Sequence, residues 1–191
     1  DDWNALTWLA SLELQATDDM FLYAKASTGY RSGGFNGRGT SIGALEIPFD
    51  EEFVTSYEVG AKADWFDSLL RTNLALFYLK YQDRQTTELR STSTGIASVI
   101  VNSGNADISG GELEIWSEPI PALRLGGSTG WNWFRFRDSS DDPINSPAFM
   151  YSMYGEYSLP PFDFGQLSAR LELQYQSQNF STATSSCTAA S

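Results

Sequence analysis

The sequence QLSARLELQYQ, residues 166–176, alternates apolar and polar side chains from one end to the other. Successive side chains of a β-strand point to opposite faces of the sheet, so this alternation predicts a strand with one apolar and one polar face. The predicted apolar face holds Leu167, Ala169, Leu171, Leu173 and Tyr175. Because the pattern recurs in about eight segments, it predicts an all-β wall with an apolar medium on one side and water on the other.

The predicted strands are longer than the strands of ordinary soluble sheets. They cover residues 5–15, 20–31, 55–66, 69–83, 107–117, 123–137, 149–159 and 166–176. Globular strands average roughly 5 to 6 residues, whereas a tilted strand needs about 9 to 11 residues to cross a bilayer. The lengths favour an antiparallel transmembrane β-barrel segment of about eight long strands.

The connections between these strands alternate between short and long. The short ones lie near residues 17–19, 67–68, 118–121 and 160–164, and the long ones at 32–53, 84–106 and 138–147, with a short apolar extension at 96–101. All tight turns should therefore lie at one end of the wall and all long loops at the other. Outer-membrane barrels separate their connections in this way.

Aromatic side chains are predicted near both ends of the strands. Trp65, Trp116, Tyr157 and Phe164 lie near the short turns, and Trp8, Tyr30, Trp131, Trp133 and Tyr175 lie toward the long loops. Two such levels match the interfacial girdles of a membrane barrel. The general preference of aromatic residues for strands is the alternative explanation.

Composition excludes several classes of function. The formal charge of the 191 residues is −12, which opposes binding to nucleic acid phosphates. The chain has no histidine, and Cys187 is its only cysteine, so neither a histidine base nor an internal disulfide is available. Glu112 and Glu114 share one predicted face without an accompanying nucleophile or metal ligand. We therefore expect lumen lining from this pair, and no enzyme, metal site or cofactor.

Three stretches resemble TonB-dependent outer-membrane receptors of the siderophore-receptor type. They are YAKASTGYRSGGFN at residues 23–36, EEFVTSYEVGAK at 51–62 and NSGNADISGGELE at 102–114, and their order and spacing also match. The resemblance implies a 22-stranded barrel around an N-terminal plug, in the outer membrane of a Gram-negative bacterium. Its partners there would be the lipid bilayer and lipopolysaccharide.

The resemblance also implies a function. Such receptors bind a scarce extracellular nutrient, typically a ferric siderophore, haem, cobalamin or a glycan, and TonB acts on the plug to release it inward. The sequence departs from the family pattern because the plug, its TonB-contacting segment and the final strands are not found in it. We therefore expect residues 1–191 to form a middle-to-late part of the barrel domain, roughly a third of its wall.

Candidate ligand contacts lie where two long loops begin. They are Tyr30, Arg31, Phe35, Asn36 and Arg38 in the first loop, and Arg84 and Arg90 in the second. An arginine fork suits carboxylate or catecholate-like oxygens, although a loop arginine can also simply be solvated. In the third loop, Asp138, Asp141 and Asp142 lack the spacing of a calcium loop, so we expect a solvated acidic loop there.

Two other architectures remain open from the sequence. Eight strands with these loop lengths could close into a small outer-membrane barrel with a structural or adhesive role. The chain could also form a soluble, glycan-binding β-sandwich, in which the apolar stripes would be buried between two sheets. The sequence does not identify the ligand or the loop residues that touch it.

Overall fold

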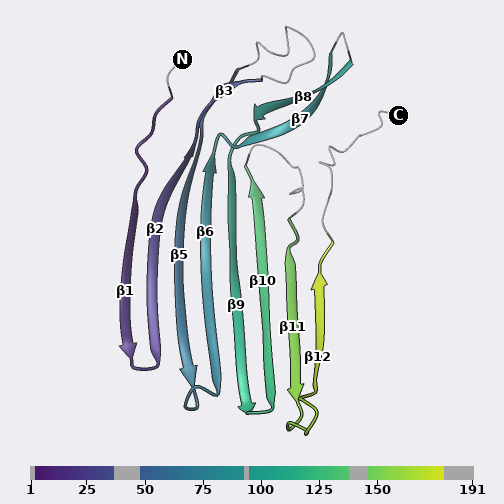
Figure 1. Ribbon diagram of the computed structural model, residues 1–191. Helices are drawn as coiled ribbons and strands as arrows, with labels where there is room; N and C mark the ends of the chain where they lie inside the picture. The colour runs from purple at the N-terminus through teal and green to yellow at the C-terminus, as the bar shows by residue number, and fades with distance from the viewer. Residues whose placement is uncertain (1–2, 37–47, 93–94, 138–145, 179–191) are drawn as a thin grey trace, which may run out of the picture.

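The computed structural model describes residues 3–36, 48–92, 95–137 and 146–178. Eight long strands in it form one antiparallel sheet, in which strands that follow one another along the chain lie side by side (Figure 1). They are β1 (Leu9–Thr17), β2 (Met20–Arg31), β5 (Glu52–Trp65), β6 (Leu70–Gln82), β9 (Ala106–Ile120), β10 (Leu123–Phe136), β11 (Phe149–Ser158) and β12 (Ser168–Gln176). The predicted fold class and the eight predicted strands are confirmed, with boundary shifts of a few residues.

Two of the long connections contain strands of their own. The short strands β3 (Gly34–Phe35) and β4 (Pro48–Phe49) pair with each other, and β7 (Gln85–Thr92) pairs with β8 (Gly95–Asn102). The sequence predicts only the apolar part of β8, because β7 is polar and a polar stretch without alternation predicts a loop. Backbone pairing with β8 satisfies the peptide groups of β7 that face β8, so β7 can form without an apolar face.

The turns and loops lie at opposite ends of the sheet, as predicted (Figure 1). Between β5 and β6 the chain reverses through Phe66, Asp67 and Ser68, which adopt φ values of 56°, 56° and 67°. The Leu69 N–H closes this turn by donating to the Phe66 carbonyl at 3.2 Å. At the other end, the β7–β8 hairpin extends beyond the main sheet, at the same end as β3 (Figure 1).

One face of the sheet exposes its large apolar side chains. Leu12 is 78% exposed, Val59 is 53% exposed and Leu171 is 79% exposed. In a sandwich these side chains would be buried between two layers, but no second layer covers them in the described part of the chain. The soluble sandwich is therefore wrong. In the same residues, no helix is long and apolar enough to cross a membrane.

The two outermost strands of the sheet remain unpaired on one side. Within the described residues, β1 pairs with β2 and β12 pairs with β11, and the two strands do not pair with each other. The sheet is therefore an open section of wall, and not a closed eight-stranded barrel.

Most of the aromatic side chains in the two predicted levels lie on the exposed apolar face. Near the long-loop end, Trp133 is 64% exposed and the ring of Tyr175 stacks on Tyr151 with centroids 5.4 Å apart. Trp116 is an exception, since it shares the opposite face with Glu112 and Glu114 by strand alternation. It is near the short turns, as predicted, but it is not part of an apolar girdle.

Candidate functional site

The second face of the sheet carries ion pairs between neighbouring strands. Lys25 Nζ lies 3.2 Å from Glu58 Oε1, linking β2 to β5. Arg71 donates to both carboxylate oxygens of Asp64, at 2.6 and 2.9 Å, linking β6 to β5. Directly opposed charges of unlike sign stabilise a strand pair. Each pair therefore places two charges on one side of the wall without leaving either unpaired.

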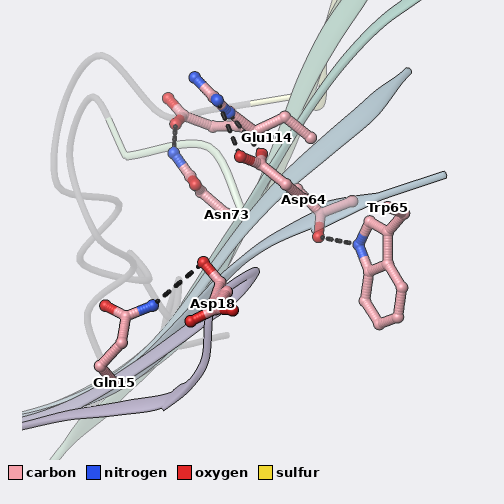
Figure 2. A network of polar contacts seen from close by, with 8 residues as sticks. Gln15, Asp18, Asp64, Trp65, Asn73 and Glu114 are labelled. Carbon is pink, nitrogen blue, oxygen red and sulfur yellow. Dashed lines mark hydrogen bonds and ion pairs between the residues drawn. The ribbon is translucent and has the colours of Figure 1, made fainter. Parts of the chain in front are cut away.

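The separation of polar and apolar side chains is visible at the short-turn end (Figure 2). The Asn73 amide donates to the Glu114 carboxylate at 3.2 Å on the polar face. On the opposite side of the sheet, the Trp65 indole N–H donates to Thr72 Oγ1 at 3.0 Å (Figure 2). The indole on the apolar face thus satisfies its only donor within the sheet, as an apolar surrounding requires.

A polar hollow of about 290 Å³ lies on the charged face, across β2, β5, β6 and β9. The side chains that give it its polar character are Tyr23, Glu58, Lys62, Asn73, Glu112 and Glu114. The predicted orientation of Glu112 and Glu114 is confirmed, because both face this charged side. The hollow offers hydrogen-bond acceptors and one lysine to whatever lies against the wall.

A cluster of buried amides holds the long-loop end together. The backbone N–H of Gln85 donates to the Glu52 carboxylate at 2.6 Å. The side-chain amide of Gln85 donates to the carbonyls of Ser32 and Asp50, both at 2.9 Å. Gln85 is buried and thereby ties the start of β7 to the connection between β2 and β5.

Two asparagines extend this cluster to β8. The Asn102 amide donates to the carbonyls of Asp50 and Asp83, at 2.9 and 2.7 Å. Asn36 is buried, and its amide donates to the Ile100 carbonyl at 3.0 Å while its oxygen accepts from the Ile100 N–H at 2.6 Å. Asn36 therefore pairs with the backbone of β8 in the manner of a neighbouring strand.

The comparison with known sequences identifies the kind of wall that this sheet forms. The family described as "TonB dependent receptor-like, beta-barrel" matches residues 1–189. The chain belongs to this family. Its members are transport receptors of the Gram-negative outer membrane, so the sheet is a section of an outer-membrane barrel.

Individual relatives agree with this assignment. The chain is 30% identical over 129 residues to the ferric-pyoverdine M114 receptor PbuA of Pseudomonas sp. (strain M114), a match that covers 62% of the chain and 15% of PbuA. The fold is similar to that of the ferric yersiniabactin uptake receptor FyuA of Yersinia pestis, with a TM-score of 0.70 and 21% identity over 87% of the chain and 25% of FyuA. It is similar to that of the copper transporter OprC, with a TM-score of 0.69 and 18% identity over 87% of the chain and 25% of OprC. The chain thus spans a quarter or less of the length of these three proteins.

Membership of the TonB-dependent receptor family assigns the two faces of the sheet. Outer-membrane barrels carry an apolar band on their outer face and polar side chains on their inner face. The apolar face, with Leu12, Val59 and Leu171 exposed, is therefore the outer face of the wall, and the charged face is the inner one. In outer-membrane barrels the short turns are periplasmic and the long loops extracellular. The buried cluster around Gln85 therefore lies at the extracellular mouth of the receptor wall.

The structure places four of the five predicted contact residues of the first loop at this mouth, but in different surroundings. Arg31 ends β2 and is exposed. Phe35 is 55% exposed and its ring lies edge-on to Trp3, with centroids 6.4 Å apart.

The other predicted contact residues of the first loop are less available. The ring of Tyr30 packs against the ring of Phe53, with centroids 5.3 Å apart. Asn36 is buried in backbone pairing, and Arg38 lies outside the described residues.

Of the two arginines predicted as ligand contacts in the second loop, the structure describes the side-chain contacts of Arg84 only. The guanidinium of Arg84 lies 4.5 Å from the centroid of the Phe136 ring and donates to Ser103 Oγ at 3.2 and 3.3 Å. Arg90 belongs to β7, but its side chain is outside the described residues. Asp138, Asp141 and Asp142 also fall outside them. Ligand contact by any of these residues stays a prediction.

Sequence reasoning missed the amides that organise the mouth, Gln85 and Asn102. Both residues stand in polar stretches that resemble ordinary solvated loop. A periodicity argument cannot find them, because each donates to a backbone carbonyl of the distant connection between β2 and β5. The asparagine at the start of the 102–114 stretch was visible only as part of the family resemblance.

Proposed function

We propose that residues 1–191 are part of the barrel wall of a receptor that binds an extracellular ferric siderophore and imports it with TonB-coupled energy. TonB would act through a plug domain inside the barrel. The single observation that carries the proposal is the two-faced wall, apolar toward lipid and charged toward the lumen, in a chain of the TonB-dependent receptor family. A section of wall alone neither encloses the ligand nor moves it, so transport belongs to the whole receptor.

The mouth supplies chemistry that suits such a ligand. Arg31 and Phe35 are exposed at the extracellular end, next to the braced cluster around Gln85. A guanidinium can pair with carboxylate or catecholate-like oxygens, and an aromatic ring can pack against a flat chelating group. Bracing favours binding because side chains on a preorganised backbone lose less freedom when a ligand arrives.

The choice of an iron chelate rests on the relative with the higher sequence identity. PbuA is named as a ferric-pyoverdine receptor, and it shares 30% identity with the chain over the matched region. The fold does not identify the ligand, since a ferric yersiniabactin receptor and a copper transporter both have a similar fold. Pyoverdine-type siderophores are therefore the first ligands to test.

The test is uptake by the complete receptor that contains this wall section. A strain without endogenous siderophore production, and with the receptor gene deleted or restored, is supplied with radioactive iron on single siderophores, including pyoverdine. We expect uptake of at least one ferric siderophore to depend both on the receptor and on TonB. Uptake that is identical with and without the receptor for every iron source would overturn the siderophore assignment. Haem, cobalamin and glycans would then be tested in the same strains.

A further inference from the structure

Charged side chains are almost absent from the lipid-facing side of the sheet, and those present lie in one row. Strand alternation puts Leu76 and Tyr78 of β6 on the lipid-facing side, and hence also Lys80. Lys80 is directly opposite Asp107 of β9, and Asp107 is directly opposite Arg135 of β10. Within the paired stretches of the eight main strands that the structure describes, no other charged residue occupies a lipid-facing position.

This row lies just beyond the extracellular edge of the apolar band. On β6 the band runs from Leu70 to Tyr78, and on β10 from Leu123 to Trp133, so the next lipid-facing positions are Lys80 and Arg135. Bands of this length match the roughly 9 to 11 residues that a tilted strand needs to cross the hydrocarbon. Tyr78 and Trp133 mark the interface, as aromatic residues do in membrane barrels. The row therefore lies at the depth of the outer-leaflet headgroups.

The acid in the row is already paired. Arg137, just after β10, lies 2.7 Å from Asp107 Oδ2 through Nη2 and 2.8 Å through Nε. These two contacts from one guanidinium balance the charge of the carboxylate. Asp107 therefore holds Arg137 beside the row.

The two other cations of the row have no such partner. Among the residues that the structure describes, neither Lys80 nor Arg135 has an acidic side chain within 4.0 Å. Among the described residues, three cations around one paired acid leave an excess of positive charge at this place, in a chain whose formal charge is −12. Lys80 and Arg135, which have no acidic side chain within 4.0 Å in this part of the chain, lie on either side of a fixed carboxylate and form a site for an anionic group.

We propose that Lys80 and Arg135 bind a phosphate group of lipopolysaccharide at the outer surface of the barrel. The long-loop end is the extracellular end, and the outer leaflet there consists of lipopolysaccharide, whose lipid anchor carries phosphates close to its acyl chains. An arginine can bind such a phosphate with two hydrogen bonds, and a lysine adds a point charge. This inference rests on the outer-membrane placement in the proposed function, and does not depend on which nutrient is imported.

The test measures binding of purified lipopolysaccharide to the complete receptor in nanodiscs of neutral phosphatidylcholine. The variant K80Q/R135Q is compared with K62Q/R31Q, which removes the same charge from side chains that do not face lipid, and with the charge-conserving K80R/R135K. Each basic residue near an anionic surface contributes about fivefold, so K80Q/R135Q should bind roughly 30-fold more weakly. We expect K62Q/R31Q and K80R/R135K to stay close to the unmodified receptor.

Different lipids and a transport assay separate the alternatives. Dephosphorylated lipopolysaccharide should bind the unmodified receptor roughly 30-fold more weakly than intact lipopolysaccharide does. This comparison needs no variant and therefore holds even if K80Q/R135Q fails to insert. Unchanged binding of K80Q/R135Q, or equal loss in K62Q/R31Q, would overturn the proposal, and equal affinity for phosphatidylglycerol would overturn the commitment to lipopolysaccharide. Iron uptake by K80Q/R135Q should remain normal. A receptor that binds lipopolysaccharide through this row but imports no siderophore would contradict the proposed function alone.

Discussion

Gly60 of β5 lies so close to the phenol ring of Tyr23 on β2 that a Cβ on residue 60 would come within 2.4 Å of the ring carbons. The two residues are directly opposite each other in the strand register. Glycine is needed here because only a residue without a side chain lets the ring lie across its strand. The same relationship joins Gly126 to Tyr154, which suggests that inner-face aromatic rings pack across the strands through such glycines.

Replacing Gly60 with alanine should destabilise the receptor. The added methyl group would force the ring of Tyr23 out of its place, and overpacking of this kind typically costs about 1 to 3 kcal/mol. Urea unfolding of the complete receptor in lipid vesicles measures the loss. The matched control is Gly130→Ala, because a Cβ there would meet Met150 Cγ at an ordinary 3.6 Å. Equal losses in the two variants would show that the contact with Tyr23 is not the cause.

Leu171→Arg should destabilise the barrel in a bilayer by about 2 to 4 kcal/mol, since it places a charge on the lipid-facing side at mid-strand. Leu171 is 79% exposed on that face. A folding titration in vesicles checks the value. Gln174→Arg on the same strand is the control, because Gln174 faces the lumen side and already bonds to Glu172 at 2.9 Å. A cost near zero for Leu171→Arg would contradict the assignment of the two faces.

Asn36→Ala should loosen the β7–β8 hairpin. Asn36 makes two hydrogen bonds to the backbone of Ile100, and their loss leaves that peptide group without these partners in a partly buried position. Hydrogen exchange of the complete receptor should show faster exchange at the Ile100 amide, with little change in the main sheet. If exchange were unchanged while siderophore affinity fell, Asn36 would be a direct ligand contact rather than a brace.

Arg31→Ala should weaken siderophore binding without lowering the stability of the barrel. Arg31 is exposed at the mouth, and the loss of one charged hydrogen bond raises a Kd by about 10- to 100-fold. Calorimetry with the siderophore identified by the uptake assay checks the affinity. Arg124→Ala serves as the control, since Arg124 pairs with Glu156 at 3.2 Å near the short-turn end. An unchanged affinity in Arg31→Ala would mean that this arginine is simply solvated.

The sequence predicted the architecture well where the signal was local. The alternation in residues 166–176 predicted both the strand β12 and its lipid-facing side, and Leu171 is exposed as expected. Prediction failed for β7, whose polar residues carry no stripe, and for Trp116, which stands near a girdle level but on the charged face. The position of a residue along a strand predicts how deep in the membrane its side chain lies. Which face of the sheet the side chain occupies depends instead on whether the residue is an odd or an even number of positions from a known lipid-facing residue.

The sequence alone determined the main strands, their two faces, the separation of turns from loops and the family, because side-chain alternation and short motifs are properties of neighbouring residues. Only the tertiary structure brought Asn36 to Ile100 and aligned Lys80, Asp107 and Arg135 in one row. These contacts join residues far apart in the chain, and cross-strand register and loop-to-loop hydrogen bonds exist only once the sheet has formed.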